Sequence, residues 1–276
     1  MFLVYGDDSA DQKKERVCAV GVVAGTEVMW EALEPKWIAC NDGIPFHARD
    51  CESDRGDYAH FAHERNKALY REVTTMLAES GLGGLGIAID LAAQRKIFPG
   101  SLDLSYYKAF MEVLDRTKMF AVRDQQRAKF TFDVSTQNEY NADFLYASVR
   151  ENDPEASALF DAEISFVSAR DNPRVQTGDL MAFEAMKALD NTIGPTKRKR
   201  RSWEALRATE RFDVFAYGEE WFADLKRQLG NLEDQLGCSR QDYVKWLKEK
   251  KRQHSTSSLF HFTHWKWKEE RQITTS

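Results

Sequence analysis

The sequence predicts an α/β protein in which a mixed sheet is flanked by helices. Short apolar runs typical of strands follow one another, separated by brief polar turns, in the first 33 residues, which favours an antiparallel meander. From residue 85 onward, strand-like runs alternate with amphipathic helical patterns, as they do in parallel α/β sheets. Past residue 190 the composition changes to a basic run followed by helical patterns. We therefore expect a core over residues 1–190 and a mainly helical C-terminal extension over residues 191–276.

Composition and length exclude several classes of protein. A chain of 276 residues can bury a full core, and its hydrophobic fraction of 42% and charged fraction of 30% are those of a soluble globular protein. No apolar run approaches the roughly 18 residues that a membrane helix needs, and the N-terminus lacks a signal-peptide pattern. We therefore expect a cytoplasmic protein with no membrane partner. With a net charge of −5, binding to nucleic acid would have to use local basic patches.

The cysteines favour neither a disulfide framework nor a structural zinc site. They are widely scattered along the chain, and no two of them form a C-x-x-C pair: Cys18, Cys40, Cys51 and Cys238.

The N-terminal third is expected to begin with three strands, over residues 1–6, 16–23 and 27–33. Asp7 and Asp8 directly follow the first strand and would lie where the backbone leaves the sheet. The alternative is ordinary turn chemistry, since aspartate and serine favour turns.

The central part of the chain is predicted to alternate between irregular, helical and extended segments. Residues 35–54 read as an irregular segment, and we expect its titratable run F-H-A-R-D to form a surface loop near a site. The patterns that follow predict helices over residues 57–79, 104–120 and 141–150, and strands over residues 85–89, 129–134 and 163–167.

Aspartates end three of the predicted strands. Asp7, Asp90 and Asp133 each follow or close an apolar run. Because parallel strands end on the same side of a sheet, these carboxylates could gather at one edge.

A fourth aspartate lies in a helical pattern that begins near Pro173. Six residues form one stripe of this helix, and only Asp179 among them is not apolar: Val175, Asp179, Ala182, Phe183, Met186 and Leu189. A carboxylate facing the core needs a basic partner, N–H donors or a bound cation to offset its desolvation. Asp179 is therefore either a buried structural residue or a metal ligand.

Several converging carboxylates are typical of a magnesium or manganese site. Hard divalent cations prefer oxygen ligands, and two such ions can activate water and stabilise the leaving oxygen of a phosphodiester. Asp7, Asp133 and Asp179 would form such a set. The chain contains no G-x-S-x-G, P-loop or H-E-x-x-H motif that would indicate another chemistry.

Two of these segments resemble a known family. Residues 5–10, Y-G-D-D-S-A, resemble the Y-x-D-E-S-G start of a large prokaryotic and phage-borne family, the domain of unknown function 3800. Ser168 together with residues 175–180, V-Q-T-G-D-L, resembles its later S…Q-x-A-D-L helix motif, and Phe132-Asp133 matches its strand-terminal aspartate. The resemblance covers roughly residues 1–190.

The resemblance implies a ribonuclease H-like, integrase-like fold with metal-binding aspartates and nuclease activity. It points to Asp7, Asp133 and Asp179 as catalytic metal ligands of Mg²⁺ or Mn²⁺, with Asp8 standing where glutamate is usual and serving as an accessory ligand. Asp90 is the alternative to Asp133. This chain departs from the family pattern at two positions, Ala10 for glycine and Gly178 for alanine, and neither change removes a ligand.

The C-terminal extension carries the residues expected to bind nucleic acid. Residues 197–201, K-R-K-R-R, would contact phosphates, and the aromatic and basic residues of the tail over 260–268 would stack on bases. A solvated loop and a packed final element are the structural alternatives for these two segments.

Metal-dependent hydrolysis of nucleic acid is the function that we expect. A non-catalytic module that binds nucleic acid or protein, and a hydrolase of nucleotides or other small phosphate esters, are the alternatives.

Overall fold

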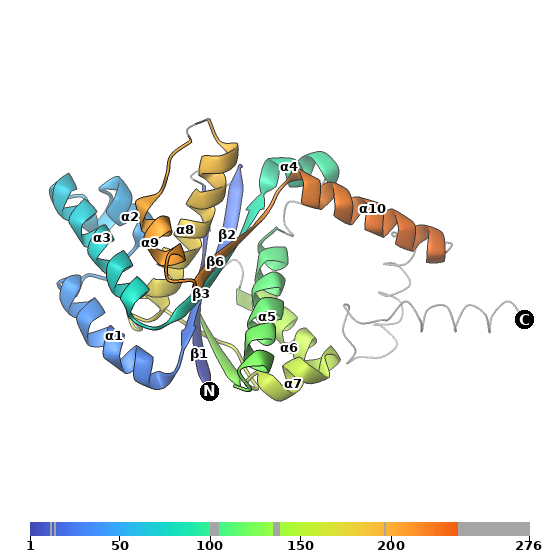
Figure 1. Ribbon diagram of the computed structural model, residues 1–276, viewed down its shortest axis with the longest axis horizontal. Coiled ribbons are helices and arrows are strands. Elements are labelled where there is room, and N and C mark those ends of the chain that lie inside the picture. The colour runs from blue at the N-terminus through green and yellow to red at the C-terminus, as the bar shows by residue number, and fades with distance from the viewer. Residues whose placement is uncertain (12, 14, 100–104, 135–138, 196, 237–276) are drawn as a thin grey trace, which may run out of the picture.

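A six-stranded mixed sheet forms the centre of the protein, which confirms the predicted α/β class (Figure 1). The computed structural model describes residues 1–11, 13, 15–99, 105–134, 139–195 and 197–236. The strands are β1 (Phe2–Ala10), β2 (Val17–Gly25), β3 (Gly83–Asp90), β4 (Ala128–Asp133), β5 (Ser165–Val167) and β6 (Phe212–Tyr217).

The strands lie in the order β5-β4-β1-β2-β3-β6. β1, β2 and β3 are successively antiparallel, whereas β4 pairs in parallel with β1, β5 with β4, and β6 with β3. An antiparallel unit is therefore joined to parallel strands on both sides.

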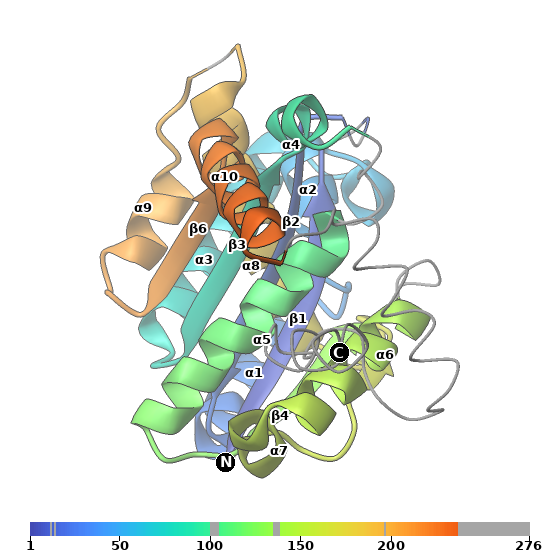
Figure 2. The ribbon, with the colours of Figure 1, turned by 90° about the vertical axis from the view of Figure 1, so that its right-hand side faces the viewer.

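Helices cover both faces of the sheet. One face carries α1 (Glu27–Cys40), α2 (Ala48–Ser53), α3 (His63–Glu79), α8 (Val175–Ile193) and α9 (Arg201–Arg207). The other face carries α5 (Ser105–Arg123), α6 (Glu139–Asn152) and α7 (Pro154–Leu159), with α5 running along the strands (Figure 2). A 3₁₀ turn (Gly56–Tyr58) precedes α3, while α4 (Leu91–Ile97) follows β3 and α10 (Glu219–Leu236) follows β6.

The central strands are apolar on both sides because helices cover both sides. Along β1, Val4 is buried in the core beneath α5, whereas Tyr5 is buried in the core beneath α8. In β2, Val20 and Ala19 divide between the two cores in the same way. This alternation is why a run such as V-C-A-V-G-V-V contains almost no polar residue.

Two expectations for the N-terminal third are wrong. Residues 27–33 belong to helix α1, so β3 supplies the third antiparallel strand, and the segment expected to be irregular contains the end of α1 and all of α2. Trp30, Leu33 and Trp37 are buried at spacings of three and four, which is the helical period. Pro35 lies inside this helix, where the sequence had suggested a break.

The sheet continues beyond the predicted core boundary at residue 190. Strand β6 lies in the extension and pairs with β3 from Gly84↔Phe212 to Ile89↔Tyr217. The expected helices of the extension are present as α9 and α10. The predicted tail over residues 260–268 and Cys238 lie outside the described residues. In the part of the chain that is described, no helix has the length and apolar character needed to cross a bilayer.

Helix α8 packs on the sheet with its main chain nearly touching the strands. A Cβ atom on Gly178 would lie 2.7 Å from the Cα and C atoms of Gly6. A Cβ atom on Gly21 of β2 would overlap the main chain of Ala182, and one on Gly86 of β3 would lie 2.5 Å from the Ala185 Cβ. Glycines therefore permit this close approach.

We predict that Gly21→Ala destabilises the fold. The added methyl group meets the main chain of α8, which cannot move aside as a flexible side chain could, so we expect a loss of about 1–3 kcal/mol in the free energy of unfolding. Urea denaturation measures this loss. Gly218→Ala is the matched control, because nothing lies within 4 Å of the added methyl group there. Equal stability of the two variants would contradict the prediction.

Candidate active site

Asp7 and Asp133 lie side by side where β1 and β4 separate. The parallel register pairs Gly6 with Phe132, and the pairing of these strands ends there. Phe132 is buried in the core beneath α5. Because side chains alternate along a strand, the following residues, Asp7 and Asp133, both point to the opposite face, which α8 covers.

The end of β1 differs from the expectation. The strand continues through Ala10, because Asp7 to Ala10 remain paired with β2, from Asp7↔Gly21 to Ala10↔Cys18. Asp7 therefore follows the last residue of β1 that pairs with β4, but it lies within the part of β1 that pairs with β2. The carboxylate lies within a strand that one neighbour still supports, so its main chain is held more firmly than a turn would hold it.

Asp179 reaches this place from α8. The adjacent Gly178 packs on Gly6, and a Cβ there would also lie 3.0 Å from the Asp7 nitrogen. The Asp179 side chain is buried, and its Oδ2 accepts a hydrogen bond of 2.6 Å from the Ala48 N–H. The Nε2 atom of His47 lies 3.9 Å from the Asp179 Oδ1 atom. Two of the three expected compensators, an N–H donor and a basic neighbour, are therefore present.

The three carboxylates are close enough to change one another's ionisation. Burial is the largest cause that raises the pKa of Asp7 well above its ordinary value, followed by repulsion from Asp179, Asp8 and Asp133. Burial also raises the pKa of Asp179, against the attraction of His47 and the hydrogen bond from Ala48. This is the crowding of like charges that the sequence pattern predicted.

Asp133 is held by the main chain. Its Oδ1 accepts a hydrogen bond of 2.9 Å from the Ala169 N–H, in the segment that leads from β5 to α8. Burial raises the pKa of Asp133, and this hydrogen bond, one from the Val134 N–H and the nearby His47 oppose the rise. The carboxylate therefore links β4 to the chain that enters α8.

Asp8 points to the other face of the sheet from Asp7, although its charge also acts on Asp7, and Asp90 lies on a strand that is not adjacent to β1. Alternation along β1 directs Asp8 to the face that α5 covers. There the burial of Tyr106 on α5, and after it the charge of Asp8, raise the pKa of Tyr106. Asp90 caps α4 by accepting a hydrogen bond of 2.9 Å from the Ala93 N–H, and its strand β3 pairs with β2 instead of β1. Of the two alternatives for the middle carboxylate, the structure thus places Asp133 beside Asp7.

His47 and Arg49 are the site residues that sequence reasoning did not single out. The run F-H-A-R-D was expected to lie near a site, and it does, although Ala48 to Asp50 begin helix α2 and do not form a loop. His47 approaches Asp179, and its Nδ1 atom lies 3.1 Å from the Asp50 Oδ2. Arg49 donates to the carbonyl oxygen of Ala10. The only signal in the sequence was the density of titratable residues.

The motif residues beside the carboxylates are structural. Gln176 Oε1 accepts hydrogen bonds of 2.9 Å from both the Trp37 Nε1 and the Phe46 N–H, while its Nε2 donates to the Ala169 carbonyl at 2.7 Å. This buried glutamine therefore joins α1, the segment before α2 and the start of α8.

Arg174 supports the same corner. Its guanidinium donates to Glu34 at 2.8 Å, to Glu27 at 2.9 Å and to the Tyr5 hydroxyl at 3.3 Å. Tyr5 and Arg174 thus connect β1 and α1 to the start of α8.

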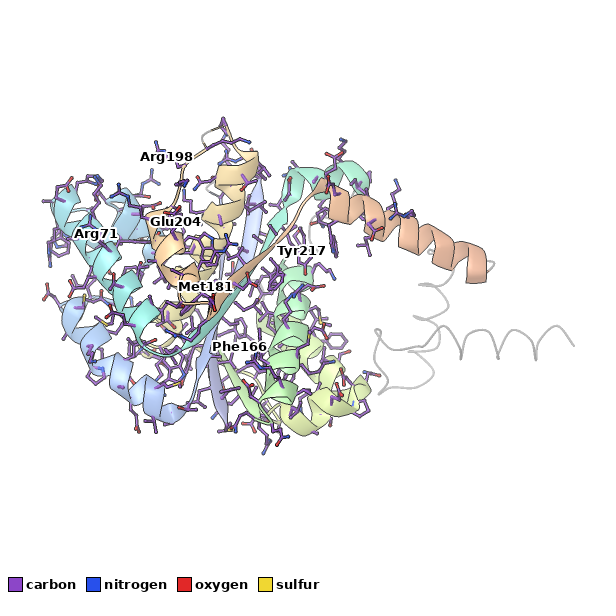
Figure 3. All side chains as sticks on the ribbon, in the orientation of Figure 1. Arg71, Phe166, Met181, Arg198, Glu204 and Tyr217 are labelled. Carbon is purple, nitrogen blue, oxygen red and sulfur yellow. The ribbon has the colours of Figure 1, made fainter. Side chains whose placement is uncertain are left out.

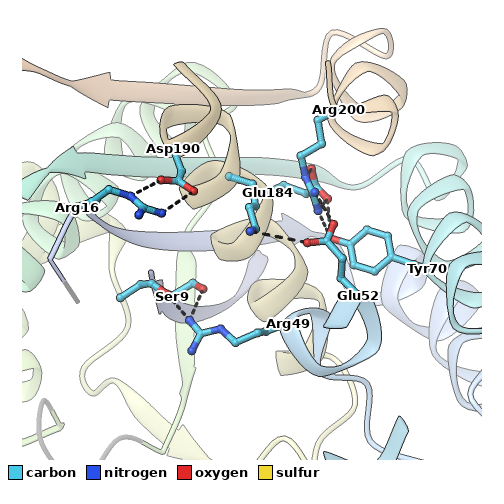
Figure 4. A network of polar contacts seen from close by, with 10 residues as sticks. Ser9, Arg16, Arg49, Glu52, Tyr70, Glu184, Asp190 and Arg200 are labelled. Atoms are coloured by element: carbon cyan, nitrogen blue, oxygen red, sulfur yellow. Dashed lines mark hydrogen bonds and ion pairs between the residues drawn. The ribbon is translucent and has the colours of Figure 1, made fainter. Parts of the chain in front are cut away.

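A second buried polar cluster lies farther along α8 (Figure 4). Glu184 is fully buried and accepts hydrogen bonds of 2.7 and 2.8 Å from the Arg200 guanidinium and one of 2.5 Å from the Tyr70 hydroxyl. Arg200 also pairs with Glu52 of α2. Although burial opposes it, the Tyr70 and Glu184 groups raise the pKa of Arg200 well above its ordinary value. One residue of the expected basic run is therefore a buried anchor.

Carboxylate oxygens are the ligands that a hard divalent cation prefers, but these three carboxylates are not grouped around a common point. Asp7 and Asp179 each accept one main-chain hydrogen bond and Asp133 accepts two, which leaves further lone pairs available on each carboxylate. Within the described ranges, however, no three His, Cys, Asp or Glu side chains are grouped as they would be around a metal ion. Side-chain rotation would be needed to bring their oxygens together.

No protein-family model matches the chain, and no curated protein matches it either.

We predict that Asp7→Asn stabilises the metal-free protein at neutral and alkaline pH. Because the folded-state pKa of Asp7 is raised, folding takes up a proton, and the free energy of unfolding falls as the pH rises from the unfolded pKa, about 3.9, through the folded pKa. The neutral amide avoids this loss. Thermal melts in chelator at pH 4 to 8 should show a gain for the variant that disappears toward pH 4.

Asp213→Asn is the control for this series. The exposed Asp213 also accepts a hydrogen bond from the next main-chain N–H, at 2.9 Å. The variant Asp213→Asn should not change the melting temperature in a pH-dependent way. A gain that is the same at every pH for Asp7→Asn would contradict the electrostatic explanation.

We predict that Arg200→Ala destabilises the protein by about 3–5 kcal/mol, because it leaves the buried Glu184 carboxylate without its cation. Urea denaturation measures the loss. Arg201→Ala, at the exposed neighbouring residue, should change the free energy of unfolding by no more than about 0.5 kcal/mol. Similar losses in both variants would mean that Arg200 does not anchor the chain.

Proposed function

We propose that the protein is a nuclease that hydrolyses phosphodiester bonds with Mg²⁺ or Mn²⁺ held by Asp7, Asp133 and Asp179. The observation that carries the proposal is the meeting of these three carboxylates, from β1, β4 and α8, on one face of the sheet. Buried like charges are costly, and they are kept where a cation or a reaction requires them.

The architecture supports a ribonuclease H-like core. In that superfamily, as the resemblance implies, an antiparallel unit precedes parallel strands and carries metal-binding aspartates. Here β1, β2 and β3 form the antiparallel unit, and β4 and β5 extend it in parallel beyond β1. The resemblance of residues 5–10 and 175–180 to the domain of unknown function 3800 agrees with this proposal.

The residues around the carboxylates have distinct roles in the proposed site. The Ala48 and Ala169 N–H groups orient Asp179 and Asp133, so that one oxygen of each is held by the main chain. The half-exposed His47 lies 3.9 Å from Asp179, where its imidazole could contact the substrate. The bound cation would supply the activation of water and the stabilisation of the leaving oxygen.

A specific observation also favours the non-catalytic alternative. Each of the three carboxylates already has a main-chain N–H partner, and Asp179 also has His47 beside it. Such a site can be stable without a cation, and the fold would then serve only to bind nucleic acid or a protein. This alternative predicts retention of nucleic acid without cleavage.

We predict that Mn²⁺ raises the melting temperature of chelator-treated wild type and not that of Asp179→Asn. A ligand that binds only the folded state stabilises it by about 2.7 kcal/mol at 100 times its Kd. Asp213→Asn, which changes an exposed carboxylate, should respond like wild type. No stabilisation in any of the three proteins would favour the binding module.

Cleavage of labelled DNA and RNA in Mn²⁺ tests the reaction itself. Loss of a residue that merely supports a metal ligand costs 10–100-fold, so we expect losses of at least about 100-fold for Asp7→Asn, Asp133→Asn and Asp179→Asn. Full activity of Asp7→Asn would refute the assignment. Turnover of a mononucleotide ester with no cleavage of polymers would instead indicate a small phosphate-ester hydrolase.

A further inference from the structure

A large basic groove lies between α3, the end of α8 and the start of α9. Its volume is about 990 Å³, and the described residues that line it include seven lysines and arginines and a single acidic residue, Glu52. The chain as a whole carries a net charge of −5, so this concentration of positive charge is local. A concave surface with one sign of charge focuses its field and attracts oppositely charged ligands.

Three of the seven basic residues that line the groove form no ion pair with a described residue. These three are Arg71, Arg198 and Arg201, and Lys67 pairs with the exposed Glu64 at 3.3 Å. Arg71 extends from α3, whereas Arg198 lies on the segment that joins α8 to α9 (Figure 3). Two separate elements therefore contribute unpaired cations to the same groove.

The groove is built on the Arg200 network. Arg200 inserts between Glu184, Glu52 and Tyr70, and so fixes the segment on which Arg198 lies. Glu52, the one acidic lining residue, is neutralised by Arg200 and by Lys187, whose Nζ lies 3.9 Å from a Glu52 oxygen. The buried network therefore both positions the basic segment and removes the negative charge from the groove.

A smaller pocket of about 240 Å³ adjoins the groove at Lys187, which lines both. Its lining contains Arg16 and Arg49 together with Asp11 and Asp190, and Arg49 contacts β1 beside the site. Along α8, Lys187 is eight residues beyond Asp179, which is about 12 Å at 1.5 Å per residue.

We propose that this groove binds the phosphodiester backbone of a nucleic-acid strand whose reacting bond lies at the carboxylates. The inference deepens the proposed function and rests on it only for the position of that bond. Arg71 and Arg198 contact phosphates from the two sides of the groove. The substrate is accordingly a polymer and not a mononucleotide.

The test is binding of a fluorescein-labelled 20-nucleotide strand, measured by anisotropy in chelator at several salt concentrations. We expect the double variant Arg71→Gln with Arg198→Gln to bind about tenfold more weakly at low salt. Losing two phosphate contacts should also reduce the slope of log Kd against log salt by about 1.4–1.8. The control is Lys129→Gln with Lys226→Gln, which removes the same charge outside the groove and should bind like wild type.

Three outcomes would overturn the proposal. Equal weakening in both double variants would overturn the proposal, since it would show only an effect of net charge. Competition by a mononucleotide as strong as that of the 20-nucleotide strand, at equal phosphate concentration, would overturn it in favour of a small phosphate ligand. Absence of binding in wild type at low salt would also overturn it.

The proposed nuclease function can fail independently. Binding is measured in chelator and does not depend on cleavage. If the protein binds the strand through the groove and never cleaves it, the groove proposal stands and the nuclease proposal is refuted. Conversely, cleavage of a 20-nucleotide strand with the same KM in wild type and the groove variant would retain the reaction and overturn the groove.

Discussion

The close contact between α8 and the sheet is the constraint on which the rest of the structure depends. Side chains normally separate a helix from a strand, whereas here Gly178 lies on Gly6 and Ala182 lies over Gly21, so that main chains nearly touch. The outer face of α8 is covered by other helices, and every residue in its first three turns is buried. This packing holds Asp179 against β1, and no flexible side chain intervenes to loosen the arrangement.

Burial of α8 makes its polar residues organise the surrounding chain. Gln176, Asp179 and Glu184 cannot reach water, and unpaired polar groups in such a place cost about 1–3 kcal/mol each, more when charged. Each one is paired with a segment distant in sequence, from the segment before α2 to Arg200 after α8. The helix thus forms a central spine of the structure: its buried polar side chains hold α2 and the segment that contains Arg200 in place on the sheet.

The two proposed functional regions have opposite charge and share this spine. Crowded carboxylates lie near the start of α8, where burial and then their repulsion raise the pKa of Asp7, and the basic groove lies near its end. A phosphodiester strand needs both, since its backbone requires cations for binding and its hydrolysis requires a divalent cation that carboxylates can hold. Helix α8 carries Asp179 near its start and Lys187 of the groove near its end, so in the proposed nuclease it would connect the two regions.

The sequence by itself determined the α/β class, the amphipathic helix that carries Asp179 and the aspartates that end β3 and β4, because these depend on local periodicity. It placed the end of β1 too early, since the pairing of Asp7 to Ala10 with β2 is a long-range contact. It misassigned residues 27–33, where Pro35 obscured a helical spacing of tryptophans, and it did not single out β6, a short apolar run whose partner β3 is more than a hundred residues away. Only the tertiary structure decided that Asp133 and not Asp90 lies beside Asp7, since strand order depends on long-range pairing. It also showed that Arg200 is buried within a basic run, because its acidic partners come from α2 and α8.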